Sequence, residues 1–405
     1  MPIYFSFKAQ PSDFFVSEEL AFEPSGQGEF LYLFFEKRQK NTMEILETLC
    51  KATGLKREDL GIAGLKDKEG ITRQRLSIGK KKLNAVGGKD FVLDQLRKEV
   101  QLLKLCFHDE PLAVGKNKGN HFRIRLRKRA SLPEQLKTEL EARLEVSREA
   151  FFPNAFGIQR FGKGNKNYKK AEELFRTARP GKMNYEVRFK LQAFGSMWFN
   201  ELVMKRREEK AFLLEGDLMV NGWNAFGSSV AEYREGKLQH FDYWKLKQEK
   251  FGSVPGKTQH FGKIRFGRKV TKERYFEPEQ FVWSSDFNPV RWFSTGAVLG
   301  IEQLFCAKGS PARTFDDWQL EASSFTEGGL QISEQAQLYG FRRPLWIRPS
   351  ELSWVWEEED LILEFSLPTG SYASVFLASL LTEIDPQGCV SNGLIIPIVS
   401  RTLFS

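Results

Sequence analysis

The 405-residue sequence predicts an α+β protein with two or three domains. Some segments place apolar side chains at every second position, which is the period of a strand, and others place them at every third or fourth position, which is the period of a helix. Hydrophobic residues make up 41% of the chain and charged residues 28%. This composition is typical of globular proteins and excludes a chain that is disordered from end to end.

The first strong elements form a strand followed by a helix. Residues 30–35 read FLYLFF and predict an aromatic strand. Asn41 has the features of a helix N-cap, with Glu44 as its capping-box partner. Gly54 is a natural end for that helix, because glycine adopts the left-handed conformation found just beyond helix termini.

A second strand is predicted over residues 71–78, after a short loop over residues 61–68. The stretch over residues 80–90 is rich in Gly and Lys, and we expect it to be an exposed loop. Residues 121–127 alternate between apolar and basic side chains, which predicts a half-buried strand. The open face of that strand would carry a row of arginines, namely Arg123, Arg125 and Arg127.

The remaining elements are divided by two segments with Pro and charged residues, over residues 180–182 and 343–349, which we interpret as the seams of an inserted domain. We predict helices over residues 171–178, 191–208 and 374–381 and a hairpin with an acidic turn over residues 352–367. No period of 20–50 residues repeats, so a solenoid is not expected.

The chain is basic, with a formal net charge of +9, and this indicates a polyanionic partner. Three stretches carry the charge. Residues 116–129 and 160–170 contain no acidic residue, and residues 245–275 carry ten Lys or Arg against two Glu. Glycines, asparagines and aromatic residues among these cations suit phosphate contacts and base stacking. We therefore expect nucleic acid, with RNA favoured, and binding that weakens as salt rises.

The four cysteines lie far apart, and four reduced thiols are expected. None of the four histidines is spaced like a zinc ligand, so a metal centre is not expected. The first ten residues lack the pattern of a signal peptide, and the apolar runs are short of the ~20 residues that a membrane span needs. We expect a cytoplasmic protein that does not bind membranes.

The most unusual local sequence is the loop over residues 61–68, GIAGLKDK, in which Asp67 lies between two lysines. Glycines in such a loop allow close approach of a ligand, and an ionised carboxylate can act as a nucleophile or a base. The flanking cations should lower the pKa of Asp67. On local grounds alone, a type I turn with a solvated aspartate is the simpler interpretation.

This loop belongs to an ordered series of motifs that resembles the TruD family of pseudouridine synthases. The resemblance covers about the first 180 residues and the last sixty. The motifs are PSDF with Val16, NT at Asn41, DLGIAGLKDK followed by ITRQ, KGNHF at Lys118, PNAFGIQRFG at Pro153, LSW at Leu352 and LPTGSYA at Leu367.

The resemblance implies a V-shaped α+β architecture. A pseudouridine-synthase catalytic domain with a mixed or antiparallel sheet would be built from residues 1–179 and 348–405. An inserted α+β TRUD domain would span residues 180–347. The RNA would lie between the two domains, with residues 245–275 positioned to contact its backbone.

The resemblance also implies an activity, the isomerisation of a uridine in RNA to pseudouridine, which in bacterial members takes place at uridine 13 of tRNA. It implies tRNA as the partner and no need for a metal or organic cofactor, and it does not imply a protein partner. Asp67 would be the catalytic aspartate, which either attacks C1′ of the ribose or removes a proton from C2′ to give a glycal. In both routes the uracil must first leave its stack, at a cost of roughly a few kcal/mol.

Further roles follow from the matching positions. Lys8 is expected to pair with the catalytic carboxylate, and Lys66 to support it. Asn154 would hydrogen-bond the uracil edge, and aromatic residues would stack on or enclose the base. The aromatic positions are Phe14, Phe156 and Tyr372, and the expected RNA-backbone contacts are Lys118, Arg123, Arg125, Arg160 and Lys163. Without the motifs, Phe14 and Phe156 would be interpreted as core residues and Asn154 as a cap.

Some positions depart from the family pattern. Glu69-Gly70 stands where many members have His-Ala, which adds a negative charge near Asp67, and Tyr372 replaces a family Phe. Three alternatives stay open: a synthase for another RNA, a non-catalytic RNA-binding or RNA-folding protein, and a basic chain that binds acidic proteins.

Overall fold

The computed structural model describes most of the chain, and the elements below belong to that part. The described ranges are residues 4–162, 165–177, 185–221, 230–251, 275–278, 283–289, 291–325, 327–381, 390–391 and 394–395. The expected seam at residues 180–182, most of the basic stretch over residues 245–275, and Lys163 lie outside these ranges. The fold is α+β with several sheets, as predicted.

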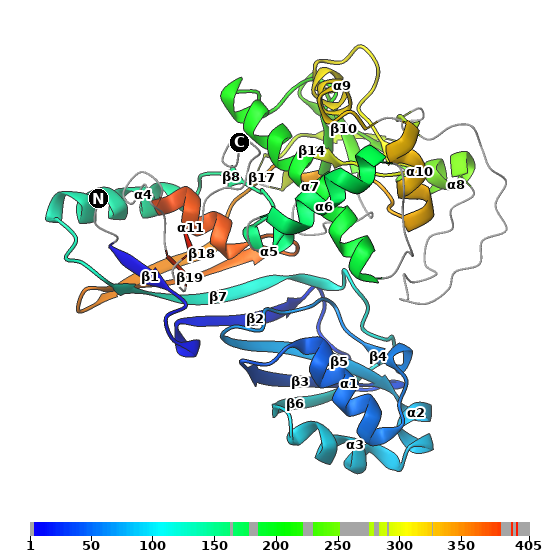
Figure 1. Ribbon diagram of the computed structural model, residues 1–405, viewed down its shortest axis with the longest axis vertical. Helices are drawn as coiled ribbons and strands as arrows, with labels where there is room; N and C mark the ends of the chain where they lie inside the picture. The colour runs from blue at the N-terminus through cyan, green and yellow to red at the C-terminus, as the bar shows by residue number, and fades with distance from the viewer. Residues whose placement is uncertain are drawn as a thin grey trace.

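The large sheet is built from strands of both chain ends (Figure 1). Its main path runs β21-β20-β1-β7-β2-β5-β3-β6, with β19 beside β7, β18 beside β19 and β4 beside β5. The pairs β2–β5 and β1–β20 are parallel and the others are antiparallel, so the sheet is mixed. The strands are β1 Phe5–Phe7, β2 Phe14–Leu20, β3 Phe30–Arg38, β4 Leu60–Gly61, β5 Ile71–Gly79, β6 Gln101–His108, β7 Asn117–Lys128, β18 Ser350–Glu357, β19 Asp360–Pro368, β20 Val390–Ser391 and β21 Leu394–Ile395.

Helices cover this sheet at two places, and each place has its own apolar core. One core joins β3 and β5 to a group of amino-terminal helices, and includes Leu33 and Leu46. The other joins β7 and β19 to the helices α4 and α11, and includes Phe122 and Phe376. The helices are α1 Thr42–Thr53, α2 Lys80–Ala85, α3 Gly88–Arg97, α4 Glu134–Ser147 and α11 Ala373–Leu381, with the 3-10 turns Pro11–Asp13 and Arg57–Asp59.

The small sheet has six strands in the order β13-β11-β10-β9-β14-β16. Helix α7 packs on β14 and helix α6 packs on α7, which forms a core that includes Phe161, Phe194 and Phe199. The strands are β9 Leu218–Asn221, β10 Val230–Arg234, β11 Lys237–Phe241, β13 Trp283–Asp286, β14 Trp292–Val298 and β16 Phe341–Pro344. The helices of this part are α5 Ile158–Phe161, α6 Lys166–Thr177, α7 Tyr185–Glu208, α8 Tyr243–Phe251, α9 Pro311–Ser323 and α10 Glu327–Ala336.

Two short pairs of strands complete the described structure. β12 Tyr275–Phe276 pairs in parallel with β15 Gln303–Leu304. β8 Phe152–Pro153 pairs antiparallel with β17 Trp346–Ile347. β8 follows α4 of the large sheet and β17 follows β16 of the small sheet, so the chain passes between the two sheets twice, at adjacent positions.

Most of the predicted elements are present. Strands β3, β5 and β7, helices α1, α6, α7 and α11, and the β18–β19 hairpin confirm the predictions. Helix α1 begins at the N-cap Asn41, whose side chain accepts a hydrogen bond from the Met43 amide, and ends at Gly54 with a φ of 79°. The expected capping contribution of Glu44 is not among the contacts that the structure gives for this helix.

The predicted loop over residues 80–90 is wrong, because the segment forms α2 and the start of α3. Lys is a good helix former, and Leu83 and Val92 are buried against the core beneath. The glycines act only between the two helices, where Gly87 has a φ of 101°. The lysine side chains that suggested an exposed loop instead lie on the solvent-facing sides of these two short helices.

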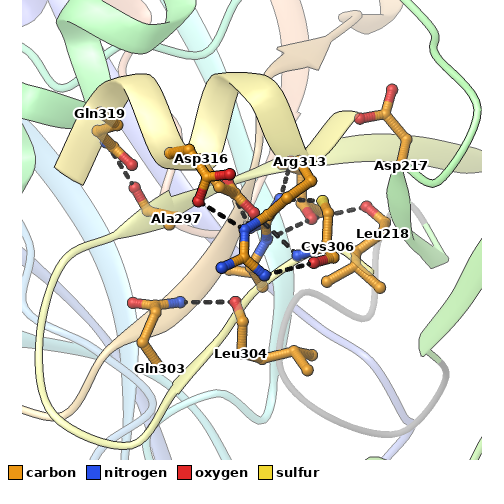
Figure 2. Close-up of polar contacts among 12 residues, drawn as sticks. Asp217, Leu218, Ala297, Gln303, Leu304, Cys306, Arg313, Asp316 and Gln319 are labelled. Carbon is orange, nitrogen blue, oxygen red and sulfur yellow. Dashed lines mark hydrogen bonds and ion pairs between the residues drawn. The ribbon is translucent and has the colours of Figure 1, made fainter. Parts of the chain in front are cut away.

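A buried polar network lies within the small-sheet part, and Figure 2 shows its members Asp316 and Cys306. Arg342 Nη1 donates to both carboxylate oxygens of Asp316, at 2.9 and 2.8 Å. The Cys306 amide donates to Asp316 Oδ2 at 2.9 Å, and Thr295 Oγ1 accepts from Arg342 Nε at 3.1 Å. Burial raises the pKa of the Cys306 thiol well above its usual range. These bonds satisfy buried charges that would otherwise destabilise this core.

None of the helices in the described part of the chain has both the length and the apolar character that a bilayer span needs.

Candidate active site

Asp67 lies in the loop that connects β4 to β5, over residues 62–70. Its carboxylate Oδ2 is 3.3 Å from Lys8 Nζ, so the expected ion pair is present. The Asp67 side chain is 44% exposed, whereas the Lys8 side chain is 7% exposed. The carboxylate of Asp67 is therefore accessible to solvent, and the buried ammonium of Lys8 holds it in position.

Lys8 holds two further groups together. Its Nζ lies 3.9 Å from the centroid of the Phe14 ring, which is a cation–π contact, and 3.9 Å from the Glu69 carboxylate. Lys8 has a φ of 57°, which is uncommon for a residue with a side chain and is often found at functional sites. Glu69 therefore adds a second negative charge at this lysine, as its position in the sequence suggested.

The main chain of the loop is held by β3 and its C-terminal turn. Lys37 Nζ donates to the carbonyl oxygens of Asp67 at 2.6 Å, Lys40 at 2.8 Å and Lys66 at 3.5 Å. Burial lowers the pKa of Lys37 to about 8. The Gln39 amide donates to the carbonyl of Gly70, so the end of β3 contacts the loop at two points.

Gly70 is required where the loop enters β5. Its φ is 101°, and a Cβ at this position would lie 2.4 Å from the carbonyl oxygen of Phe14.

Lys66, which we expected to support Asp67, places its Nζ 3.0 Å from Glu18 of β2, and both side chains are buried. Lys66 thus attaches the loop to the sheet through Glu18.

A second cluster gathers three of the residues expected to bind the base. Arg343, on β16, donates from Nε to the Asn154 carbonyl at 3.0 Å and from Nη2 to Asn154 Oδ1 at 2.9 Å. Its Nη1 donates to the Gly370 carbonyl at 2.8 Å. The guanidinium carbon lies 4.2 Å from the Phe156 ring centroid and 5.9 Å from that of Tyr372. Phe156 and Tyr372 are themselves 6.1 Å apart between centroids.

Asn154 is buried, and both ends of its amide are bonded, because Nδ2 donates to the Pro344 carbonyl at 3.0 Å. Its partners are thus a carbonyl and an arginine rather than a helix terminus. Phe14 and Phe156 are also buried, each in a different apolar core. Tyr372 packs against both of these cores. Tyr372 therefore lies where these two apolar cores meet.

The basic residues expected to contact RNA differ in their surroundings. Arg123 pairs with Glu364 at 2.9 Å, and Arg125 pairs with Asp360 at 2.7 Å and Glu357 at 2.8 Å. The predicted row of arginines on β7 is present, but each member faces a carboxylate.

Arg160 Nε donates to Ser196 Oγ at 3.0 Å, and the guanidinium lies 5.5 Å from the Phe156 ring centroid. The carbonyl of Lys118 accepts from the Thr369 amide.

Sequence reasoning missed Lys37 and Arg343. Lys37 lies on the same face of β3 as the buried Leu31, Leu33 and Phe35, and a lysine in that register is the signal that could have marked it. Arg343 lies in the segment that we interpreted only as a seam. Both cations bind main-chain carbonyls of distant segments, and sequence periodicity does not show such pairings.

One group in the described chain could accept a metal ion, because ligand atoms of Glu19, His121 and Glu351 lie within 4.8 Å of one another. Ser366 Oγ lies 3.3 Å from His121 Nδ1 and 3.3 Å from Glu19 Oε1, so hydrogen bonds already connect two of the three residues. Cys50, Cys106 and Cys306 are free thiols, and Cys389 lies outside the described residues.

The sequence was compared with models of protein families and with curated proteins, and both comparisons match one family. The family model described as tRNA pseudouridine synthase D (TruD) matches residues 2–175. A tRNA pseudouridine synthase D from Campylobacter jejuni is 32% identical over 389 residues, which cover 94% of this chain and 93% of the relative. The relative from Wolinella succinogenes is 32% identical over 387 residues, with 94% and 95% covered.

A solved structure shares the fold. The crystal structure of a protein from Methanosarcina mazei, described as a putative tRNA pseudouridine synthase D (TruD), matches with a TM-score of 0.53 and 17% identity, and covers 96% of this chain and 95% of that chain. The curated relatives at 32% identity place the protein among the pseudouridine synthases, which are isomerases. Within that class, the chain belongs to the TruD family.

Proposed function

We propose that this enzyme isomerises uridine 13 of tRNA to pseudouridine and that Asp67 is the catalytic aspartate. The observation that carries the proposal is the pairing of Asp67 with Lys8. The loop presents a half-exposed carboxylate, and a buried ammonium 3.3 Å away fixes its position. A positioned carboxylate that a substrate can reach is what both proposed chemical routes require.

The reaction breaks the N1–C1′ glycosidic bond and forms a C5–C1′ bond. In one route Asp67 attacks C1′ and the uracil leaves, turns, and returns through C5 as the ester to Asp67 is released. In the other route Asp67 removes a proton from C2′ to give a glycal, and the proton returns as C5 bonds to C1′. In both routes the hydrogen on C5 is finally lost and N1 gains one, so no cofactor is needed.

The uracil, once out of its stack, would be bound between the two clusters. Tyr372 is half-buried and lies beside Phe156, so its ring could wall in the base. Phe14 would contact the base from the Lys8 side. Asn154 would reach a uracil edge by exchanging one of its present hydrogen bonds. Arg343 would support this binding site, because it binds Asn154 and the Gly370 carbonyl.

The RNA would lie between a catalytic domain that carries the large sheet and an inserted domain that carries the small sheet, in a V-shaped arrangement. Lys118, Arg123, Arg125, Arg160 and Lys163 would contact its phosphates. The packing of α6 on α7 and of Phe161 in the core of the small-sheet part favours a boundary close to β8. The double crossing at β8 and β17 supports an insertion between these two strands.

The substrate is tested with a pair of tRNA transcripts that differ only at position 13. We expect pseudouridine in the transcript with uridine 13 and none in the transcript with cytidine 13. Modification at another position of tRNA, or of ribosomal RNA alone, would contradict the proposed target. Tight binding without any pseudouridine would instead favour the non-catalytic RNA-binding alternative.

A further inference from the structure

Lys37 is a buried cation beneath the loop that carries Asp67. It lies near the end of β3, in register with Leu31, Leu33 and Phe35, which face the core made with α1 and α3. The residue is 1% exposed. The apolar side chains on this face of β3 are therefore followed by the ammonium of Lys37, at the point where the strand meets the loop that carries Asp67.

All three N–H groups of this ammonium have main-chain acceptors, which is the full donor capacity of a lysine. Two acceptors, the carbonyls of Asp67 at 2.6 Å and Lys66 at 3.5 Å, lie in the loop. The third, the carbonyl of Lys40 at 2.8 Å, lies in the turn that follows β3. Lys37 thus connects the Asp67 loop to the strand that supports it.

Keeping a charge at this position has a cost. Burial disfavours the ammonium and lowers the pKa of Lys37 to about 8, while the nearby Asp67 opposes that shift and Lys66 adds to it. An apolar side chain at the same position would extend the core without this penalty. Groups that lower stability are often retained where they serve a site.

We propose that Lys37 is a positioning residue for the reaction: it fixes the main chain at Asp67, while Lys8 fixes the carboxylate. The proposal rests on the catalytic role proposed for Asp67. With the main chain free, the carboxylate would move relative to the ribose, and a misplacement of about 1 Å can reduce a rate by roughly 100-fold. Lys37 does not contact the substrate itself.

The test compares Lys37→Met, which keeps the length of the side chain and removes its donors, with Lys37→Gln, which keeps two N–H donors. Lys40→Met is the matched control, because that variant removes a lysine of the same turn whose Nζ pairs with Glu99 at 2.8 Å. We expect kcat of Lys37→Met to fall at least roughly tenfold, with KM and tRNA affinity within about twofold of the wild type. Lys37→Gln should lie between the two, and Lys40→Met should match the wild type.

The measurement is single-turnover kinetics per binding-competent enzyme, with Asp67→Asn run in parallel. A wild-type kcat in Lys37→Met beside an inactive Asp67→Asn overturns the role of Lys37 and leaves the proposed function intact. An active Asp67→Asn overturns both. If Lys37→Met does not fold, Lys37→Gln decides: a reduced kcat with unchanged KM supports the proposal, and a wild-type kcat contradicts it.

Discussion

At the residue scale, the carboxylate of Asp67 and the main chain that carries it contact two different lysines. Lys8 pairs with the carboxylate and lies over the Phe14 ring, and Lys37 binds the carbonyls. Lys66, the residue that precedes Asp67, pairs with Glu18. Lys8 after β1, Lys37 on β3 and the pair of Lys66 with Glu18 on β2 thus all hold the loop that carries Asp67. The Asp67 side chain remains half-exposed.

Removing the Lys8 charge should reduce the rate. A hydrogen bond to a charged group contributes about 1.5–3 kcal/mol, so we expect Lys8→Met to lower kcat by roughly 10- to 100-fold. Glu69→Gln is the control, because it leaves the pair between Lys8 and Asp67 in place, and its kcat should stay within about twofold. Single-turnover pseudouridine formation measures both. An unchanged kcat for Lys8→Met would show that the ion pair does not serve the reaction.

The lowered pKa of Lys37 makes a prediction about stability and pH. The unfolded chain holds the proton of this lysine up to a pH of about 10.4, and the folded chain holds it only up to about 8. Between these values the unfolded state binds more protons, so the stability of the folded state rises with pH. Relative to Lys37→Met, the unfolding free energy of the wild type should increase by roughly 3 kcal/mol over this range and stay level below it. Urea titrations at several pH values measure the difference, and a flat difference above pH 8 would contradict a depressed pKa.

At the element scale, strand β16 joins segments that are far apart in the sequence. It is the strand of the small sheet next to β14, and Arg343 near its end binds the loop after β8 and the turn after β19. The Arg343 side chain is buried among the carbonyls and rings that it contacts, and burial lowers its pKa to about 10. This one side chain thus orders both motifs that are expected to enclose the base.

We therefore expect Arg343→Met to destabilise the protein by roughly 2–5 kcal/mol, because it leaves the buried carbonyl and Oδ1 of Asn154 without this donor. Arg348→Met is a matched control on the same segment. It removes an ion pair with the exposed Glu149, which should change stability by less than about 1 kcal/mol. The midpoint of urea unfolding reports both effects. Equal midpoints for the two variants would contradict the bridging role of Arg343.

Local patterns predicted the elements well and their connections poorly. The alternation over residues 121–127 and the caps at Asn41 and Gly54 depend on neighbours in the sequence, and these elements are present. The helices at residues 80–97 were missed because lysine content was given more weight than the buried apolar positions.

The pair of Lys8 and Asp67 was found only through the family resemblance, since 59 residues separate the two partners. Lys37 binds main-chain carbonyls, and two of the three hydrogen bonds of Arg343 do so too, so residue type does not mark most of their partners. Their roles depend on which loops cross which strands, and that information exists only in the folded chain.

At the scale of the whole molecule, two sheets with separate cores are connected by two adjacent crossings, β8 and β17 (Figure 1). The large sheet carries Asp67 and Lys8, and the small-sheet part supplies Arg343 and Phe199, which contact Phe156. Residues from both parts therefore surround the positions expected to bind the base. A net charge of +9 favours a polyanionic substrate for the molecule as a whole.

Binding of tRNA should be strongly dependent on salt. If two or more phosphates are contacted, the dissociation constant should rise at least roughly tenfold between about 50 and 200 mM monovalent salt. Filter binding or fluorescence anisotropy with unmodified tRNA gives the slope. A dissociation constant that stays level over this range would exclude phosphate contacts as the main source of affinity.

The central claim is that Asp67 performs the chemistry, and the most direct measurement is pseudouridine formed by Asp67→Asn under single-turnover conditions, quantified by mass spectrometry of the digested tRNA. The substitution keeps the size of the side chain and removes its charge. We expect tRNA to bind with an affinity within about threefold of the wild type and pseudouridine formation to fall by at least roughly 1,000-fold. Pseudouridine formed at a rate close to that of the wild type would contradict the account.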